Sequence, residues 1–244
     1  MIKQMDYFNK IHNVDCLEGM KQLPDESIDL IVTDPPYRIT AKGNCGSMGG
    51  YWMTKEALSG KIFEHNDTDI EDYLPEFYRL LKDGSHCYIM TNNLNLPHFM
   101  DVINKSDFHF MKLLIWDKGN KICGRYYMGC YEIIIFLRKG SDRQINDCGA
   151  SDLISIPNKK TKNEDGSNIH NSEKPIELMR YLIENSSNKN DIVLDPFMGS
   201  GTTALACMEC DRQYIGYELD KKYFDLINKR IEEEKNQKKS SSLF

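Results

Sequence analysis

The segment from residue 191 to residue 218 limits the possible fold more than any other part of the sequence. An apolar run ends at Asp195 and is followed by a turn with two glycines, an apolar helical stretch and a second apolar run that ends at Glu218. A strand, a glycine turn, a helix, a strand and an acidic residue in this order are typical of a nucleotide-binding βαβ unit. The segment therefore predicts an α/β sheet.

The turn also indicates what the unit binds. Gly199 and Gly201 allow a ligand to approach the backbone closely, and Glu218 can accept hydrogen bonds from both hydroxyls of a ribose. The third glycine of a dinucleotide fingerprint is missing, because Thr202 and Thr203 follow Gly201. We therefore expect an adenosine-bearing ligand that need not be NAD.

A second turn follows the apolar run at residues 27–33. It reads Asp34-Pro35-Pro36-Tyr37, and its two prolines prevent the strand from continuing. Asp34 is thus expected just past the carboxyl end of a buried strand. Ligands of open α/β sheets bind at that edge, so Asp34 and Tyr37 are candidate site residues.

The remaining pattern predicts one domain over residues 1–234, with a doubly wound, mostly parallel sheet and an antiparallel edge hairpin. The hairpin is expected from the apolar runs 108–116 and 131–137. Polar or glycine-rich stretches at about 38–60 and 140–171 are interpreted as target-recognition loops, and residues 235–244 as a disordered tail.

Three segments together resemble a known family. They are His12 to Met20, the Asp34-Pro35-Pro36-Tyr37 motif, and the stretch from His170 to Pro175 with the glycine turn that follows it. The chain resembles the β-class DNA amino-methyltransferases of the DPPY type, which act on adenine N6 or cytosine N4. The catalytic motif precedes the cofactor motif, as in that class. The resemblance implies a Rossmann-like fold that depends on S-adenosylmethionine.

The resemblance also assigns roles to residues. Those expected to line the cofactor site are Asp15, Lys174, Asp195, Phe197, Gly199, Gly201, Thr202 and Glu218. Lys174 would face the cofactor's carboxylate, Glu218 its ribose, and Asp15 its adenine edge. From the residues alone, Asp15 is equally well explained as a helix N-cap. The family usually has Pro and Thr at the positions of Asn171 and Ser172.

In the catalytic motif, Asp34 and the carbonyl of Pro35 would hold the target amine, Pro36 would keep that carbonyl rigid, and Tyr37 would stack on a base flipped out of double-stranded DNA. Serine replaces the aspartate more often in the cytosine subclass, so Asp34 favours adenine N6. Cytosine N4 remains the alternative. A non-catalytic protein that binds S-adenosylmethionine or nucleic acid is a third possibility.

Composition bears on the partners. The formal net charge of −6 argues mildly against a nucleic-acid substrate, so local basic clusters must supply the phosphate contacts, and we expect Lys159, Lys160 and Lys162 to do so. Because one small domain offers little DNA-binding surface, we expect a homodimer. A companion restriction endonuclease is possible.

Other features favour simple interpretations. Cys207 and Cys210 form a lone CxxC on an apolar helix, with no second pair at ligand spacing, so no metal is expected. No run of about 18 apolar residues occurs, and we expect a cytoplasmic protein outside the membrane.

Overall fold

In the computed structural model, residues 7–36, 68–122, 127–159 and 173–241 are described. They form an eight-stranded sheet in the order β1-β8-β7-β2-β3-β5-β4-β6. The strands are β1 (Lys10–His12), β2 (Ile28–Thr33), β3 (Leu81–Thr91), β4 (His109–Ile122), β5 (Gly129–Arg138), β6 (Leu153–Ser155), β7 (Ile192–Asp195) and β8 (Gln213–Tyr217). Only β5 runs against its neighbours, so the predicted mostly parallel α/β sheet is confirmed.

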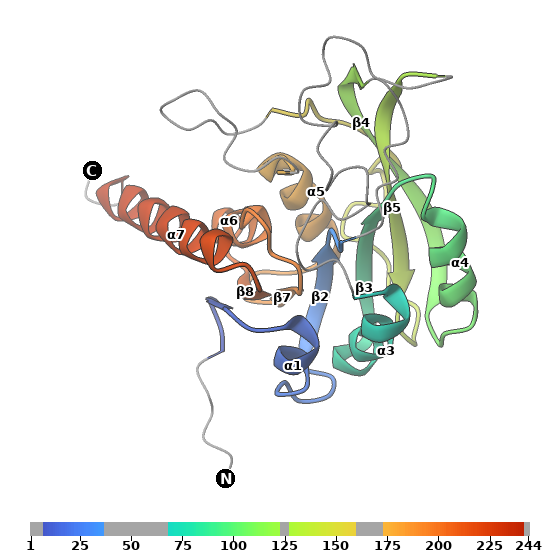
Figure 1. Cartoon of the computed structure of the whole chain (residues 1–244), viewed down its shortest axis with the longest axis horizontal. Coiled ribbons are helices and arrows are strands. Elements are labelled where there is room, and N and C mark those ends of the chain that lie inside the picture. The colour runs from blue at the N-terminus through green and yellow to red at the C-terminus, as the bar shows by residue number, and fades with distance from the viewer. Residues whose placement is uncertain (1–6, 37–67, 123–126, 160–172, 242–244) are drawn as a thin grey trace, which may run out of the picture.

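Helices cover both faces of this sheet (Figure 1). One face carries α1 (Cys16–Met20), α3 (Ile70–Leu80) and α4 (Leu96–Asn104), and the other carries α5 (Ile176–Ser186), α6 (Thr202–Glu209) and α7 (Lys221–Ser241). Each face buries its own apolar core, as a doubly wound sheet requires. No helix in the described parts of the chain is long and apolar enough to cross a membrane.

Local chemistry explains where α3 begins. Asp69 accepts from the Ile70 amide at 2.6 Å, and Asp72 accepts from the Asp69 amide at 3.0 Å, which makes a capping box. Tyr73 and Phe77 then lie one turn apart on the buried side of the helix. The buried side of α3 therefore packs against one face of the sheet, and the first turn of the helix lies near the carboxyl end of β2.

The connections between parallel strands change from one side of the sheet to the other between β7 and β2, and this position is the topological switch point. From β2 the chain passes through α3 to β3 on one side, whereas from β7 it passes through α6 to β8 on the other. Because β2 and β7 are adjacent and parallel, with Leu30 opposite Val193, their carboxyl ends meet where the two directions diverge. Such a switch point is where ligands bind in open α/β sheets.

Two details at the edges of the fold differ from the expectation. The antiparallel pair is not outermost, because β6 lies within the expected loop 140–171 and pairs in parallel with β4. Buried Ile154 and a 2.8 Å hydrogen bond from Trp116 Nε1 to the Ile156 carbonyl hold this short strand. The expected loop at 38–60 lies outside the described residues.

The expected disordered tail is helical over residues 235–241, since α7 continues to Ser241. Two lysine contacts accompany the helix in this part of the chain. Lys235 binds Glu232 at 2.8 Å, and Lys238 donates to the carbonyl of Met208 at the end of α6. Residues 242–244 lie outside the described part of the chain.

Candidate active site at the switch point

Asp195, the last residue of β7, organises the turn that follows it. Its carboxylate accepts from Thr203 Oγ1 at 2.6 Å, from Thr33 Oγ1 at 2.8 Å and from the Phe197 amide at 3.1 Å. Burial raises the pKa of this carboxyl to about 6, although these three donors oppose the shift. Through these hydrogen bonds, Asp195 connects the end of β2 to the glycine turn.

The glycine turn has the backbone that its sequence predicts. Gly199 and Gly201 have φ angles of 54° and 81°, in the left-handed region that favours glycine. A Cβ on Gly201 would lie 2.7 Å from Cγ2 of Ile227 on α7, so no side chain fits there without displacement. The backbone of the turn can thus pack closely against α7.

Glu218, just beyond β8, closes the same turn. Its two oxygens accept from the Gly199 amide at 2.8 Å and from the Asp220 amide at 2.9 Å. Burial raises the pKa of Glu218 to about 7. Because a carboxylate has about four acceptor positions, Glu218 retains capacity for further donors such as ribose hydroxyls.

Asp34 follows β2 at the switch point. Its Oδ2 lies 2.5 Å from Nζ of Lys174, while its buried Oδ1 has no hydrogen-bond partner among the described residues. Burial raises the pKa of Asp34, and the nearby Lys174 ammonium opposes that shift. A buried acceptor without a donor is costly unless a ligand supplies one, so Oδ1 is a candidate substrate contact.

Lys174 belongs to a larger charged group. Its Nζ also lies 3.2 Å from Oε2 of Glu132 on β5, and Oε1 of Glu132 lies 3.2 Å from Nζ of Lys118 on β4. Burial acts to raise the pKa of Glu132, but the two ammonium groups outweigh it and lower that pKa. We refer to Asp34, Lys174, Glu132 and Lys118 as the charged quartet.

The sequence did not assign roles to Glu132 and Lys118. A signal was present, because Lys118 closely follows the apolar run 108–116 and Glu132 is a charged residue within the apolar run 131–137. Their meeting depends on the register of β4 and β5, which sets Trp116 opposite Glu132. That register cannot be deduced from either strand alone.

The remaining predicted residues divide into three groups. Asp15 is the N-cap of α1 and accepts from the amides of Leu17 at 2.9 Å and Glu18 at 3.2 Å. Phe197 and Thr202 lie at the glycine turn, where the Phe197 ring packs edge-on against Tyr73 and Thr202 is buried. Lys159 is exposed, and Tyr37, Lys160 and Lys162 lie outside the described residues.

The CxxC residues lie away from this edge of the sheet. Cys207 is buried on α6, and the thiol of Cys210 donates to the carbonyl of Ala206 at 2.8 Å. Nowhere among the described residues do three or more His, Cys, Asp or Glu side chains converge at metal-binding distance.

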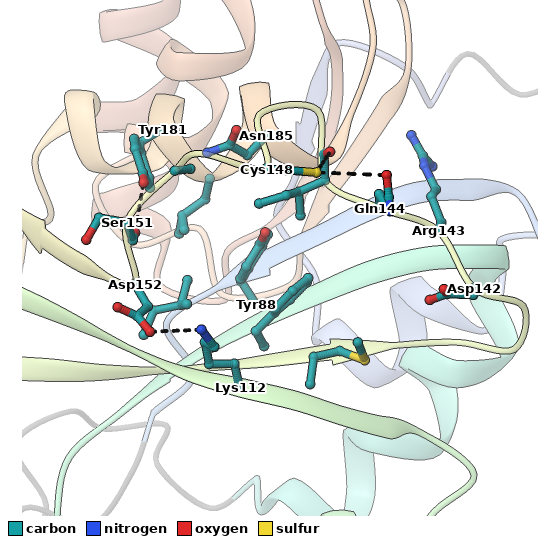
Figure 2. A pocket seen from close by; sticks show the side chains of 16 residues that line it. Tyr88, Lys112, Asp142, Arg143, Gln144, Cys148, Ser151, Asp152, Tyr181 and Asn185 are labelled. Atoms are coloured by element: carbon teal, nitrogen blue, oxygen red, sulfur yellow. Dashed lines mark hydrogen bonds and ion pairs between the residues drawn. The ribbon is translucent and has the colours of Figure 1, made fainter.

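A separate hollow of about 340 Å³ lies between α5, the segment 142–152 and the sheet (Figure 2). Tyr88 and Lys112 line it from the strands, and Tyr181 and Asn185 from α5. Its lining includes none of the charged quartet and none of the glycine turn. The chemistry-bearing residues are therefore concentrated at the switch point.

Comparison with known proteins identifies the architecture. The sequence model of the N6_N4_Mtase family, described as DNA methylase, matches residues 28–229. The chain belongs to this family. The methylase resembles the type II methyltransferase M.HinfI of Haemophilus influenzae, at 29% identity over 93% of this chain and 69% of that protein. It also resembles M2.MboI of Moraxella bovis, at 28% identity over 91% and 87%.

Solved structures share the fold of the methylase. The complex of M1.HpyAVI with S-adenosylmethionine aligns with a TM-score of 0.65 and 24% identity over 91% of this chain and 98% of that one. The PvuII DNA methyltransferase, described as cytosine-N4-specific, aligns with a TM-score of 0.69 and 17% identity over 93% and 91%. The predicted family and fold are therefore confirmed.

The residues at the switch point fit S-adenosylmethionine. The turn with left-handed Gly199 and Gly201 lies at the end of β7, and Glu218 offers carboxylate oxygens at the next strand end. Asp34 presents its unpartnered oxygen at the adjacent strand end. A methyl donor and an amine acceptor can thus meet between β7 and β2.

Proposed function

We propose that this methylase transfers the methyl group of S-adenosylmethionine to the N6 amine of adenine in double-stranded DNA. The observation that carries the proposal is the geometry of Asp34, which has one oxygen paired with Lys174 and the other buried without a partner among the described residues. An amino group placed there would donate the missing hydrogen bond.

The chemistry of the amine explains why such an acceptor is needed. An exocyclic amine conjugated to a purine is a poor nucleophile, because its lone pair is delocalised into the ring. When Asp34 Oδ1 accepts one N–H and the carbonyl of Pro35 the other, the nitrogen becomes more pyramidal and its lone pair is directed outward. The nitrogen would take the methyl group from the sulfonium, which leaves as a neutral thioether, and the amine would pass one proton to Asp34, whose Oδ1 accepts that N–H.

S-adenosylmethionine, when bound, supplies an electrophilic methyl group on a positively charged sulfur. Glu218 would accept the ribose hydroxyls, and the Gly199 to Gly201 turn would pack against the adenosine side. We keep Lys174 as a proposed contact of the cofactor's carboxylate, although in the structure its ammonium pairs with Asp34 and Glu132. Asp15 remains a proposed contact of the adenine edge.

Cytosine N4 is the second candidate, because it presents a similar conjugated amine and a cytosine-N4-specific enzyme shares the fold at a TM-score of 0.69. The fold therefore does not choose the base. The aspartate in the catalytic motif favours adenine, since the resemblance associates serine more often with the cytosine subclass.

The partners follow from the substrate. The target base must be extruded from the duplex at a cost of about a few kcal/mol, which stacking on Tyr37 would offset. Lys159, Lys160 and Lys162 would contact phosphates, and a homodimer would extend that surface. A companion restriction endonuclease is in keeping with the type II methyltransferases that the chain resembles. The cytoplasm is the expected compartment.

Replacing Asp34 with alanine tests the proposal. Lys174 keeps its second carboxylate, Glu132, so we expect Asp34→Ala to fold and to bind S-adenosylmethionine with nearly normal affinity. Turnover should fall by about 100-fold or more, because the lost acceptor acts on the amine in the transition state. Calorimetry would measure binding, and transfer of a labelled methyl group to DNA would measure turnover.

The control is Glu209→Gln, which removes an exposed ion pair between α5 and α6 at 3.0 Å. It should leave both measurements unchanged. Near-normal turnover in Asp34→Ala would exclude the proposed role of Asp34. Sequencing DNA from expressing cells with a method that detects methylated bases would identify the base, and N4-methylcytosine in place of N6-methyladenine would contradict the proposed specificity.

A further inference from the structure

Glu132 and Lys118 are buried charges that the proposed chemistry does not use. The Glu132 side chain is 20% exposed and that of Lys118 7%, and both lie in a sheet whose neighbouring side chains are apolar. Burying charges costs several kcal/mol per ion unless each is paired. The groups that pair with Glu132 and Lys118, and the role of these pairs, therefore require an explanation.

The contacts connect these two residues to the catalytic motif. Lys118 on β4 and Glu132 on β5 point to the same face of adjacent strands and pair at 3.2 Å. The other oxygen of Glu132 reaches Lys174 at 3.2 Å, and Lys174 reaches Asp34 at 2.5 Å. Positive and negative side chains thus alternate from Lys118 and Glu132 on the β4–β5 hairpin, through Lys174 at the start of α5, to Asp34 at the end of β2.

We propose that Glu132, anchored by Lys118, is a positioning residue that holds the ammonium of Lys174 and thereby fixes the carboxylate of Asp34 with its Oδ1 free for the target amine. The argument rests on geometry. Asp34 follows the last residue of β2 and precedes two prolines, so its backbone is set, but its side chain can still rotate. A lysine on a long flexible stem would not hold it without a second anchor.

This inference depends on Asp34 being the acceptor in the proposed function. It predicts that Glu132→Gln lowers kcat by about 10- to 100-fold, because a small misplacement of the acceptor is enough for such a loss. The KM for DNA should change by less than about threefold, since DNA does not contact Glu132 in this scheme, whereas the KM for S-adenosylmethionine should rise if Lys174 also contacts the cofactor's carboxylate. Glu132→Asp, which keeps the charge on a shorter stem, should recover much of the rate.

A pH profile separates positioning from simple loss of stability. Asp34 is faced by Lys174 and Glu132, by Asp195 from β7 and by Tyr73 from α3. The negative charge of Glu132 contributes to the raised pKa of Asp34. Glu132→Gln should therefore move the acidic limb of kcat to lower pH, whereas Glu132→Asp should leave it in place.

The experiment compares wild type, Glu132→Gln, Glu132→Asp, Lys118→Met and the surface control Glu209→Gln, each checked for folding by circular dichroism and for cofactor binding by calorimetry. Lys118→Met should also lower kcat, because Glu132 then loses its anchor. If Glu132→Gln does not fold, Lys118→Met serves as the test of the positioning role. Wild-type kcat and an unmoved acidic limb in either folded variant would overturn the inference. Methylation of cytosine by the wild type would refute only the proposed base, since the same variants would then be assayed on that product.

Discussion

The hydrogen bond between Thr33 and Asp195 joins the two halves of the site, and Thr33→Val tests what it contributes. Thr33 Oγ1 donates to Asp195 Oδ1 at 2.8 Å, and both side chains are buried. Valine has the same shape and suits a strand, so the variant removes the donor with little change in packing. The carboxylate keeps Thr203 and the Phe197 amide as donors.

The magnitude follows from the charge on the acceptor. A buried hydrogen bond to a charged group contributes about 1.5–3 kcal/mol, so at pH 8, where Asp195 is ionised, Thr33→Val should lower the free energy of unfolding by about 2 kcal/mol. In a chain of this size that corresponds to a fall in Tm of about 4–8 °C. At pH 5, below the pKa of about 6, Asp195 is protonated, so the cost should drop to roughly 1 kcal/mol.

Urea unfolding at both pH values would measure these costs. A double-mutant cycle with Asp195→Asn isolates the pair, and we expect a coupling free energy of about 1–2 kcal/mol at pH 8. If the two substitutions add within about 0.5 kcal/mol, or if the cost is the same at pH 5 and pH 8, the bond does not join the halves as argued.

Two further predictions concern the cofactor site and DNA. Because the pKa of Glu218 is raised to about 7, the folded chain holds a proton that the unfolded chain releases, so this residue should make the free energy of unfolding fall as pH rises from about 4.5 to 7. Glu218→Gln should flatten that slope in denaturant titrations, and an unchanged slope would show that Glu218 is not the titrating group. Replacing Lys159, Lys160 and Lys162 with alanine should reduce the salt dependence of duplex binding by about one unit of log–log slope per lost phosphate contact, without changing the methylated base. Identical slopes would show that these lysines do not contact phosphates.

The parts of the site that the sequence predicts are those set by local structure. Asp34, Asp195 and Glu218 each follow an apolar run directly, and parallel strands bring their carboxyl ends to one edge. The left-handed backbone at Gly199 and Gly201 follows from their lack of a side chain. For these residues, chain order and backbone chemistry were sufficient.

The parts that were missed depend on contacts between distant segments. Glu132 lies on β5, and Lys174 lies just before α5. The two residues meet only because the fold places β5 beside β3 and brings the start of α5 close to β5. The short strand β6 was taken as part of a loop, because its pairing partner β4 lies more than thirty residues earlier and its own three residues carry almost no periodic signal. The helical end of α7 was missed for a similar reason, since its contact with Met208 is tertiary.

The charged quartet explains how so many ionised groups can lie at the buried edge of a sheet. When Asp34 and Glu132 are both ionised, their two negative charges balance the two positive charges of Lys118 and Lys174, so the group is neutral as a whole. Removing one member leaves an uncompensated buried charge, which costs more than the lost contact alone. In the proposed mechanism, Asp34 acts while ionised in a place that excludes water, and its carboxylate must stay still. A counter-charge on a flexible stem meets the first need, and anchoring that stem to two strands of the sheet through Glu132 and Lys118 meets the second.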